Sequence, residues 1–467
     1  MNCTNTTFKF LIIRGAVLVI AGWCSACEAF LDIDPPKTEI INEVVFSNDA
    51  SAVAAMRGIY SIMMTNQSFT NGSIERYTGL SSDELVDISN TDEQQEFYHN
   101  TLSTTNQVVV SLFWREAYLY ISNANAVLEG LNASGSISPE IKQQLEGEAK
   151  FVRAFCQFYL VSLFGAVPYV TSTDYKINSA IARREIQDVY AMIVEDLNDA
   201  KALLSDDYSF SRNERSQPNR SAAAALLARV HLFAGDWASA ESEATFVIDH
   251  TELYALPDDL NSVFLANSQE AIWQLQPVTP EKSTGQARLF ILSTTPSSVI
   301  LADTLINSFE TGDAREANWI STFVNGSNVY PFPYKYKVYA SDVATEYATV
   351  LRLAEQYLIR SEARAHQDKM ADAIADIDMI RGRALLPKIA DTNPGISKED
   401  LLTAILQERK IEFFAEWGHR WIDLQRTGRA GMALSQIKAD WQDTDILYPI
   451  PQSERLVNPN LTQNSGY

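Results

Sequence analysis

The feature of this sequence that most constrains its fold is a pair of helices that occurs twice. Residues 221–250 read SAAAALLARVHLFAGDWASAESEATFVIDH, an alanine-rich helix that turns at Gly235 into a second one. Residues 351–384 have the same pattern of two alanine-rich helices, with a turn at 367–369. Small side chains at fixed places let two antiparallel helices approach closely, as in tetratricopeptide repeats. The pattern predicts a scaffold of tetratricopeptide-like helix pairs.

Helical periodicity also dominates outside these two units. Apolar residues recur at three- and four-residue spacing from Asp49 onward, and again over 107–131, 140–164 and 185–204. An alternating segment such as EAIWQLQ, which fits a half-buried strand around Trp273, is rare. We therefore expect an all-α fold, with a few short strands, that forms one large domain.

Two segments interrupt the helical pattern, at about 65–105 and about 255–345. The second contains the Gly/Ser/Thr/Pro-rich stretch STGQARLFILSTTPSS and the aromatic stretch NVYPFPYKYKVY. Long, loop-rich insertions in a regular scaffold commonly carry function. We expect these two insertions to hold the ligand face.

The N-terminal residues are typical of a lipoprotein signal. A short, mostly apolar run over 15–23 follows basic residues and is too short to span a bilayer. Small residues at 25 and 26 precede Cys27. We expect residues 1–26 to be removed and Cys27 to carry the lipid anchor. An ordinary secreted protein that is cleaved nearby is the alternative.

Charge narrows the range of partners. The chain has 37 basic and 59 acidic residues, for a net charge of -22. Such a surface repels phosphate backbones, so nucleic acid is not expected as a partner. It also disfavours peripheral binding to anionic lipid, which leaves the lipid at Cys27 as the expected membrane attachment.

Four motifs, in order along the chain, resemble the SusD/RagB family of outer-membrane nutrient-binding lipoproteins. CEAFLDIDPP is similar to the family's lipidated cysteine and the segment after it, and FETGDAREANW is similar to an Asp and Arg element. ILQERKIEFFAEWGHRWIDLQRTGR resembles the family's charged helix pair, with a departure at 416–420. YPIPQSERLVNPNLTQNSGY resembles the family's ending. The resemblance covers essentially all of the mature chain.

This resemblance implies one α-helical domain over 27–467, anchored by lipid to the outer membrane and exposed at the cell surface. Such proteins cap a SusC-type TonB-dependent transporter and help to deliver an oligosaccharide, or in some members a peptide, into its barrel. They are not enzymes. The partners it implies are the transporter, the outer membrane and an oligosaccharide or peptide ligand.

The charged C-terminal motif permits a catalytic interpretation. Paired carboxylates are what glycoside hydrolysis needs. However, a similar number of arginines lies close by in the sequence, and charge-assisted hydrogen bonds that fix helix packing explain the same pattern. We assign no catalytic residue. The motif contains Glu408, Glu412, Glu416 and Asp423 together with Arg409, Arg420 and Arg426.

No metal or cofactor is expected from the sequence. The five histidines are scattered, and none forms an HExxH pair. Once the signal is removed and Cys27 is lipidated, Cys156 is the one cysteine left, so no cysteine metal site can form. The many Asp and Asn residues leave a structural calcium ion between loops as an open alternative.

Sugar recognition needs flat apolar faces for the ring and amide or carboxylate groups for the hydroxyls. Both kinds of side chain occur in the two insertions, whereas Trp114 and Trp417 fall in helical motifs and are expected in the core. The candidate ligand residues are Phe69, Asn71, Tyr77, Phe97 and Tyr98 in the first insertion and Trp319, Asn328 and Tyr330 in the second.

The leading hypothesis is a lipoprotein that captures oligosaccharide for a transporter. A peptide ligand stays open, since an acidic surface can suit cationic peptides. Two further classes remain as alternatives: a glycosidase or peptidase on a helical scaffold, and a tetratricopeptide adaptor that binds proteins alone.

Overall fold

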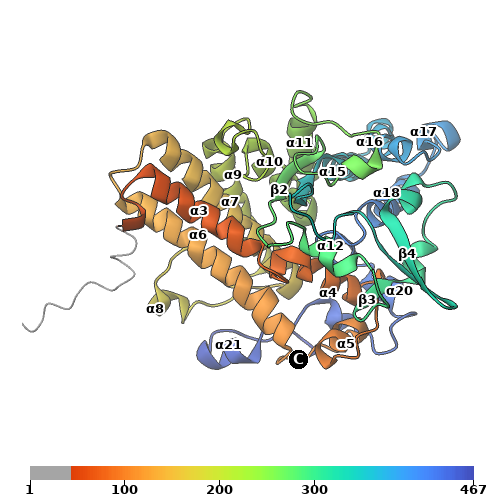
Figure 1. Cartoon of the computed structure of the whole chain (residues 1–467), viewed down its shortest axis with the longest axis horizontal. Coiled ribbons are helices and arrows are strands. Elements are labelled where there is room, and N and C mark those ends of the chain that lie inside the picture. Colours follow the sequence, from red (N-terminus) through yellow and green to blue (C-terminus); the bar gives the residue numbers. More distant parts are fainter. Residues whose placement is uncertain (1–43) are drawn as a thin grey trace, which may run out of the picture.

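The computed structural model describes residues 44–467. The expected signal peptide, residues 1–26, and the lipid anchor at Cys27 lie outside this range and stay predictions. The described chain is mainly α-helical and has short strands in small sheets, which confirms the predicted fold class (Figure 1).

Long helices build the N-terminal half. They are α3 (Asp49–Met63), α6 (Glu116–Ala133), α7 (Pro139–Phe164) and α9 (Ile186–Leu203). Helix α7 packs between α6 and α9, and α3 lies beside α6. The Asn48 side chain caps α3 by accepting a hydrogen bond from the Ser51 amide. Helix α7 ends at Phe164, where the predicted helical period also ends, and Gly165 follows it with a φ of 69°.

The two predicted helix pairs are present. The first is α10 (Arg220–Ala234) with α11 (Trp237–Ile248), and the second is α15 (Leu353–His366) with α16 (Met370–Arg383). Although about a hundred residues separate the pairs in sequence, α11 packs directly on α15. Helix α18 (Lys398–Glu412) adds a further layer against α15 and α16. The result is one continuous row of helices.

Small residues allow this close stacking, as predicted. The side chains at the junction of α10, α11 and α15 are all buried and form one apolar cluster. Because alanine occupies most of these positions, the helix backbones can approach one another closely. The cluster consists of Ala228, Leu232, Ala240, Ala244, Ile359 and Ala363.

The first insertion is less loop-like than the sequence suggested. It contains the π-helical turn η1 (Phe69–Ser73), helix α4 (Ile74–Ser81), strand β1 (Leu85–Asp87) and helix α5 (Asp92–His99). The prediction of loops was wrong for most of this segment, because Ile74, Tyr77 and Leu80 recur at helical spacing and bury their side chains.

The second insertion consists of short elements. They are strand β2 (Ala271–Leu275), helix α12 (Gly285–Phe290), strand β3 (Val299–Leu301), helices α13 (Asp303–Ile306) and α14 (Ala314–Trp319), and the hairpin β4 (Ile320–Asn325) and β5 (Asn328–Pro333). Strand β3 pairs antiparallel with β1, so the two insertions share a sheet.

Strand β2 pairs antiparallel with β6 (Ala348–Arg352), and all five residues of each strand are buried. The strand predicted around Trp273 is confirmed, but Trp273 is fully buried rather than half-buried. Its ring meets Phe155 edge to face at 5.3 Å, and Phe155 meets Trp417 at 5.8 Å. Trp114 and Trp417 are both core residues, as expected.

Short elements complete the described chain. They are α8 (Tyr175–Asn178), α17 (Ile389–Thr392), α19 (His419–Arg426), α20 (Ala430–Leu434), α21 (Gln452–Val457), η2 (Val109–Arg115), η3 (Ser209–Ser211), η4 (Leu260–Ser262) and η5 (Asp443–Ile446). Across residues 44–467, no helix combines the length and the apolar character that crossing a membrane requires.

Candidate functional site

The charged C-terminal motif forms a buried ion-pair network. Glu412 lies 2.6 Å from Arg352 and 2.9 Å from Arg315, and it also pairs with Arg383. Burial by itself would raise the pKa of Glu412, but the three guanidinium groups outweigh it and hold the pKa well below its usual range. A carboxylate held in this way serves packing.

The other carboxylates of the motif are also paired. Glu416 contacts Lys335 and Arg352, Glu408 contacts Arg315 and Arg381, and Asp423 contacts Arg409 and Arg426. The predicted pairing of these carboxylates with nearby cations is therefore confirmed. Among residues 44–467, no group of three or more His, Cys, Asp or Glu side chains is arranged to hold a metal ion.

Most of the aromatic residues predicted to bind ligand lie in the core. Phe97 packs on Tyr77 with ring centroids 4.8 Å apart, and Phe69 meets Phe113 at 5.8 Å. The Trp319 indole is buried and donates a hydrogen bond to the Leu260 carbonyl. The three side chains of Phe69, Phe97 and Trp319 have almost no accessible surface, so they offer no face to a ligand in this structure.

The remaining predicted residues are dispersed. Tyr98 is half-buried beside Lys438, whose ammonium lies 4.9 Å from the ring centroid. Tyr330 and Asn328 lie on the β4–β5 hairpin, where Asn328 is exposed and Tyr330 half-buried. The structure does not gather the predicted residues on one surface, and a ligand role for Tyr98, Asn328 and Tyr330 stays a prediction.

The two insertions do meet at a hollow of about 210 Å³, which we call the loop pocket. Its first wall is the turn between α3 and α4, and its second is α12 with Tyr339. Of the predicted ligand residues it contains Asn71. The lining residues are Asn66, Gln67, Asn71, Gly72, Arg76, Gly285, Arg288, Leu289 and Tyr339.

Asn71 holds the two walls together. Its side-chain oxygen accepts a hydrogen bond from the Gly285 amide at 2.6 Å, and its side-chain nitrogen donates to the carbonyls of Met64 and Thr65. A β-carbon on Gly285 would lie 2.2 Å from the Asn71 carbonyl oxygen, so this position needs glycine. We call the contact of Asn71 with Gly285 the clasp.

Polar groups surround the opening of the loop pocket. Asn66 and Gln67 are exposed, and Tyr339 is 49% exposed. Arg288 is half-buried and pairs with Glu281. Amides that can bind hydroxyl groups thus lie near one accessible aromatic ring. The sequence reasoning missed Tyr339, although it lies in the aromatic stretch of the second insertion.

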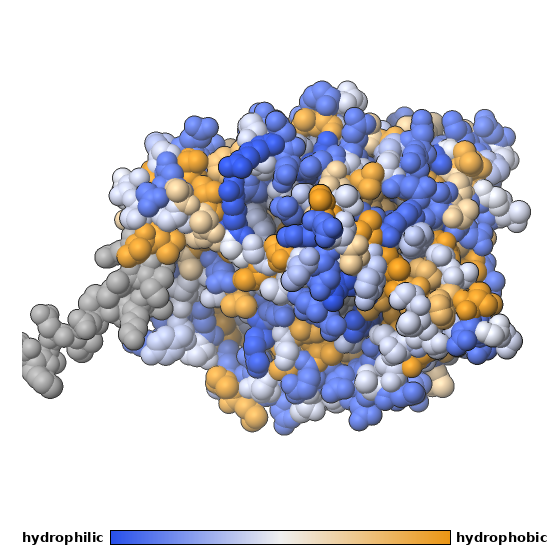
Figure 2. Space-filling view, in the orientation of Figure 1, coloured by the Kyte–Doolittle hydropathy of each residue, from blue (hydrophilic) through white to orange (hydrophobic). Residues whose placement is uncertain are grey.

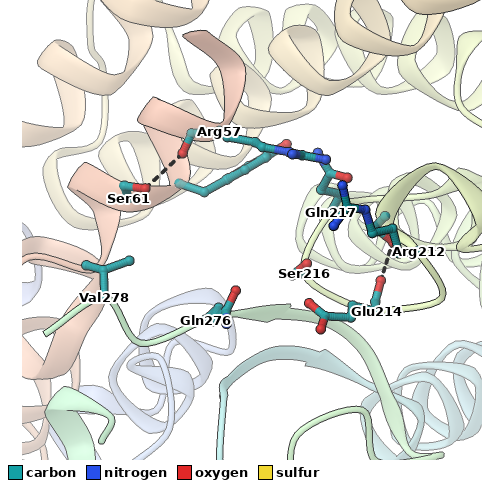
Figure 3. Close-up of a pocket in the computed structure, with 10 residues that line it drawn as sticks. Arg57, Ser61, Arg212, Glu214, Ser216, Gln217, Gln276 and Val278 are labelled. Atoms are coloured by element: carbon teal, nitrogen blue, oxygen red, sulfur yellow. Dashed lines mark hydrogen bonds between the residues drawn. The ribbon is translucent and has the colours of Figure 1, made fainter. Parts of the chain in front are cut away.

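A larger hollow of about 390 Å³ opens between α3, the loop 211–217 and the chain after β2 (Figure 3). We call it the arginine pocket, because Arg57 extends into it from α3 and Arg212 enters it from the loop. Its other lining residues are Tyr60, Ser61, Ser211, Glu214, Ser216, Gln217, Gln276 and Val278.

Arg215 fixes the loop of the arginine pocket to β2. Its buried guanidinium donates to the carbonyls of Ala271 and Leu253 and stacks over the rings of Tyr208 and Tyr254. Its backbone carbonyl accepts from the Gln274 amide at 2.8 Å. The loop is therefore held at both its side chain and its backbone, and the pocket wall is preformed.

Figure 2 is a space-filling view of the molecule in the orientation of Figure 1. Hydrophilic residues cover much of its middle, and apolar residues gather toward the right edge. Strands β4 and β5 lie on that side, and Val324 and Val329 in them are exposed.

Two family models match this chain. One, described as starch-binding and associating with the outer membrane, matches residues 29–232. The other, described as the SusD family, matches residues 315–467. The gap between the matches contains most of the second insertion.

Curated relatives match over most of the chain. SusD-like protein P2 of Formosa agariphila is 27% identical, and the match covers 91% of this chain and 94% of that protein. The starch-binding protein SusD of Bacteroides thetaiotaomicron is 24% identical, over 68% of this chain and 72% of that protein.

Solved structures have the same fold. A SusD superfamily protein from Bacteroides vulgatus has a TM-score of 0.78 at 19% identity, and the match covers 90% of this chain and 100% of that one. A laminarin-binding SusD-like protein has a TM-score of 0.76 at 24% identity, with the same coverage.

Proposed function

Because this chain belongs to the SusD family, we propose that it captures an oligosaccharide at the face formed by its two insertions and passes it to a SusC-type TonB-dependent transporter. In this proposal the protein is attached to the outer membrane by lipid at Cys27, exposed at the cell surface, and serves as a cap on the transporter. It binds its ligand and does not cleave it.

The observation that carries the proposal is the loop pocket. Two segments more than two hundred residues apart in sequence are joined there by the clasp, and exposed amides lie near the accessible ring of Tyr339. Amides pair with sugar hydroxyls, and an aromatic ring covers the apolar side of a sugar at little entropic cost.

The relatives support a carbohydrate as the ligand class. One family description names starch binding, and a structural neighbour is named as laminarin-binding. The ion pairs of the C-terminal motif support binding over catalysis, since each carboxylate is already engaged by a cation.

A peptide ligand is the second candidate. The acidic overall charge would favour a cationic peptide. The two hollows argue against it, because four arginines line them, at 57, 76, 212 and 288, whereas Glu214 is the one carboxylate in their linings. We therefore keep the glycan as the proposed ligand.

The test is a binding screen by calorimetry of the chain from residue 28 against glycans of different classes and a peptide mixture. Replacing Tyr339 or Asn66 by alanine should weaken binding of the glycan ligand about tenfold, since each loses one direct contact. Tyr175→Ala is the matched control, because Tyr175 is 73% exposed and lies in α8, away from both pockets.

Failure of every glycan to bind, or equal loss of affinity in the control variant, would contradict the proposed site. Cleavage of a bound glycan by the purified protein would contradict a role in binding alone and would favour the alternative of a glycosidase. The partnership has its own test: full-length protein that is extracted from its membrane should co-purify with a barrel transporter, and a variant lacking Cys27 should not stay in the membrane fraction.

A further inference from the structure

We propose that the glycan is acidic and that the arginine pocket binds its anionic group, a uronate carboxylate or a sulfate ester. This inference rests on the proposed function and adds the chemical class of the ligand.

The first argument is the state of the two arginines. Arg57 and Arg212 come from different elements, yet both are exposed and both line the pocket. Within the described residues neither forms an ion pair with a carboxylate, whereas buried arginines such as Arg229 and Arg352 do. Two guanidinium groups that share one hollow repel each other, and an anion between them removes that repulsion.

The second argument is an unused amide in the wall of the pocket. Gln217 is 5% exposed, and both its side-chain nitrogen and its side-chain oxygen have no hydrogen-bond partner among the described residues. Leaving a buried donor or acceptor without a partner destabilises the folded protein, because the group has lost its hydrogen bonds to water. A ligand that accepts from the nitrogen and donates to the oxygen would recover this cost.

An acidic sugar supplies both of these partners. Its carboxylate or sulfate oxygens accept hydrogen bonds, and its hydroxyl groups donate them. The planar guanidinium of arginine matches such anions with two parallel hydrogen bonds. Figure 3 shows that Arg57 reaches toward the loop that carries Arg212 and Gln217, so the three groups can act on one anionic residue.

The fixed loop makes this arrangement a preformed site. Arg212 and Asn213 both adopt left-handed backbone conformations, with φ values of 60° and 65°, and the Asn213 amide donates to the Tyr208 carbonyl at 2.7 Å. Left-handed φ is uncommon for an arginine. Because the buried Arg215 holds the loop on β2, the backbone that carries Arg212 is fixed beside the pocket without a ligand.

The acidic net charge of the protein does not oppose this assignment. At physiological ionic strength charges beyond about 8 Å are largely screened, so the groups that line the pocket decide the local potential. Those groups are two arginines and Glu214, which leaves one net positive charge at the site.

The test compares ligand classes on one protein by calorimetry. The panel contains neutral maltooligosaccharides and laminarin oligosaccharides, oligogalacturonates, carrageenan oligosaccharides and polyglutamate. Wild-type protein should bind an acidic glycan better than the neutral ones, and raising the salt concentration should weaken that binding. Oligogalacturonates carry carboxylates and carrageenan oligosaccharides carry sulfate esters, so the affinities for these two ligands show which anionic group the pocket prefers.

Variants locate the binding. Arg57→Gln and Arg212→Gln should each weaken binding of the acidic glycan about ten- to a hundredfold, as expected for a lost hydrogen bond to a charged group. Arg184→Gln is the matched control, because Arg184 is also exposed and forms no ion pair within the described chain. Gln217→Leu should weaken binding while the melting temperature stays equal or rises, which a purely structural role for Gln217 would not produce.

The outcomes separate this inference from the proposed function. Binding of neutral glycans alone, unchanged in the Arg57 and Arg212 variants, would overturn the acidic ligand and leave glycan capture standing. Binding of no glycan would overturn both. Binding of polyglutamate without any acidic glycan would replace the glycan by an acidic peptide.

Discussion

Glu84 is a buried carboxylic acid, and its Oε1 atom has no hydrogen-bond partner among the described residues. Burial, with a smaller contribution from the neighbouring charge of Asp83, raises its pKa to about 8. Glu75 and Glu148 are similar, and burial raises the pKa of each to about 7. Such groups are protonated in the folded protein at mildly acidic pH.

The first prediction concerns pH and Glu84. Because its folded pKa lies above its unfolded value of about 4.3, the folded state holds the proton more tightly, and the stability this gives is lost as pH rises toward 8. Glu84→Gln should therefore match the wild type near pH 4.5 and be more stable at pH 9, by on the order of 2–4 kcal/mol. Urea denaturation at both pH values measures the difference.

The matched control is Glu195→Gln, since Glu195 is an exposed residue in the middle of α9. It should change the free energy of unfolding little at either pH. Equal stability of Glu84→Gln and wild type at pH 9 would mean that Glu84 is ionised in the folded protein at lower pH than we infer.

Single residues also set the limit of sequence reasoning about the site. Amino-acid composition and the interrupted helical pattern predicted that both insertions form the ligand face. The two insertions do form the walls of the loop pocket. The sequence patterns could not tell which aromatics face outward, because Phe97 and Tyr339 lie in similar polar surroundings in the sequence and have opposite exposure. No sequence pattern marks Arg57 and Arg212 as candidate binding residues, because the elements that form their pocket are distant in sequence.

At the scale of the element, the helix pairs depend on small residues at their crossings. Ala240 on α11 is buried in the cluster that α10 and α15 complete, whereas Ala238, two residues earlier, is exposed. The two positions share the same helix and nearly the same local sequence, so they form a matched pair.

The second prediction uses this pair. Ala240→Leu should lower the free energy of unfolding by about 1–3 kcal/mol, because the larger side chain forces the helices apart. Ala238→Leu should leave it nearly unchanged. Thermal and urea denaturation measure both, and a large effect of Ala238→Leu would mean that α11 packs differently.

The third prediction concerns the ion pair between α10 and α15. Arg229 binds Glu355 through two hydrogen bonds of 2.7 Å, and both side chains are buried. Arg229→Met should cost about 3–5 kcal/mol, since it leaves Glu355 buried without a partner. Adding Glu355→Leu should restore much of that stability. If the double variant is as unstable as Arg229→Met alone, the loss of stability does not come from the unpaired charge of Glu355, and the ion pair itself stabilises the fold.

At the scale of the whole molecule, the network around Glu412 connects parts of the chain that no local pattern relates. Arg315 lies in α14 of the second insertion, Arg352 ends β6, and Arg383 ends α16. Arg315 is 97 residues from Glu412 in sequence. One carboxylate therefore couples the second insertion to both the sheet and the helix row.

The fourth prediction concerns this coupling. Glu412→Gln should lower the free energy of unfolding by about 3–5 kcal/mol at pH 7, because three buried guanidinium groups lose their shared charge partner. The pKa of Glu412 is depressed in the folded protein, so its contribution is present above about pH 4.3 and is lost as pH falls below that value. The two proteins should therefore approach each other in stability at low pH.

Denaturation curves of wild type and Glu412→Gln between pH 3 and pH 7 measure this convergence. A constant difference across the range would mean that the loss comes from packing rather than charge. Equal stability at pH 7 would mean that the arginines find other partners.

The fold class follows from the sequence because helix period and alanine placement are local properties that the structure keeps in α10, α11, α15 and α16. What the sequence could not provide is the contact of α11 with α15 across the second insertion, since stacking depends on surfaces rather than on order. The ion pairs of the C-terminal motif were expected as packing groups, but partners such as Arg315 could not be named.

The clasp of Asn71 and Gly285 holds the loop pocket together, and the side chains that we propose to contact the ligand are different ones. Asn66, Gln67 and Tyr339 project from walls that the clasp already fixes, so they can mutate without loosening the frame. In the proposed role, the product of a duplicated gene can thus change its ligand through substitutions at a few exposed positions. The same positions are where a protein designer would begin to change the ligand specificity.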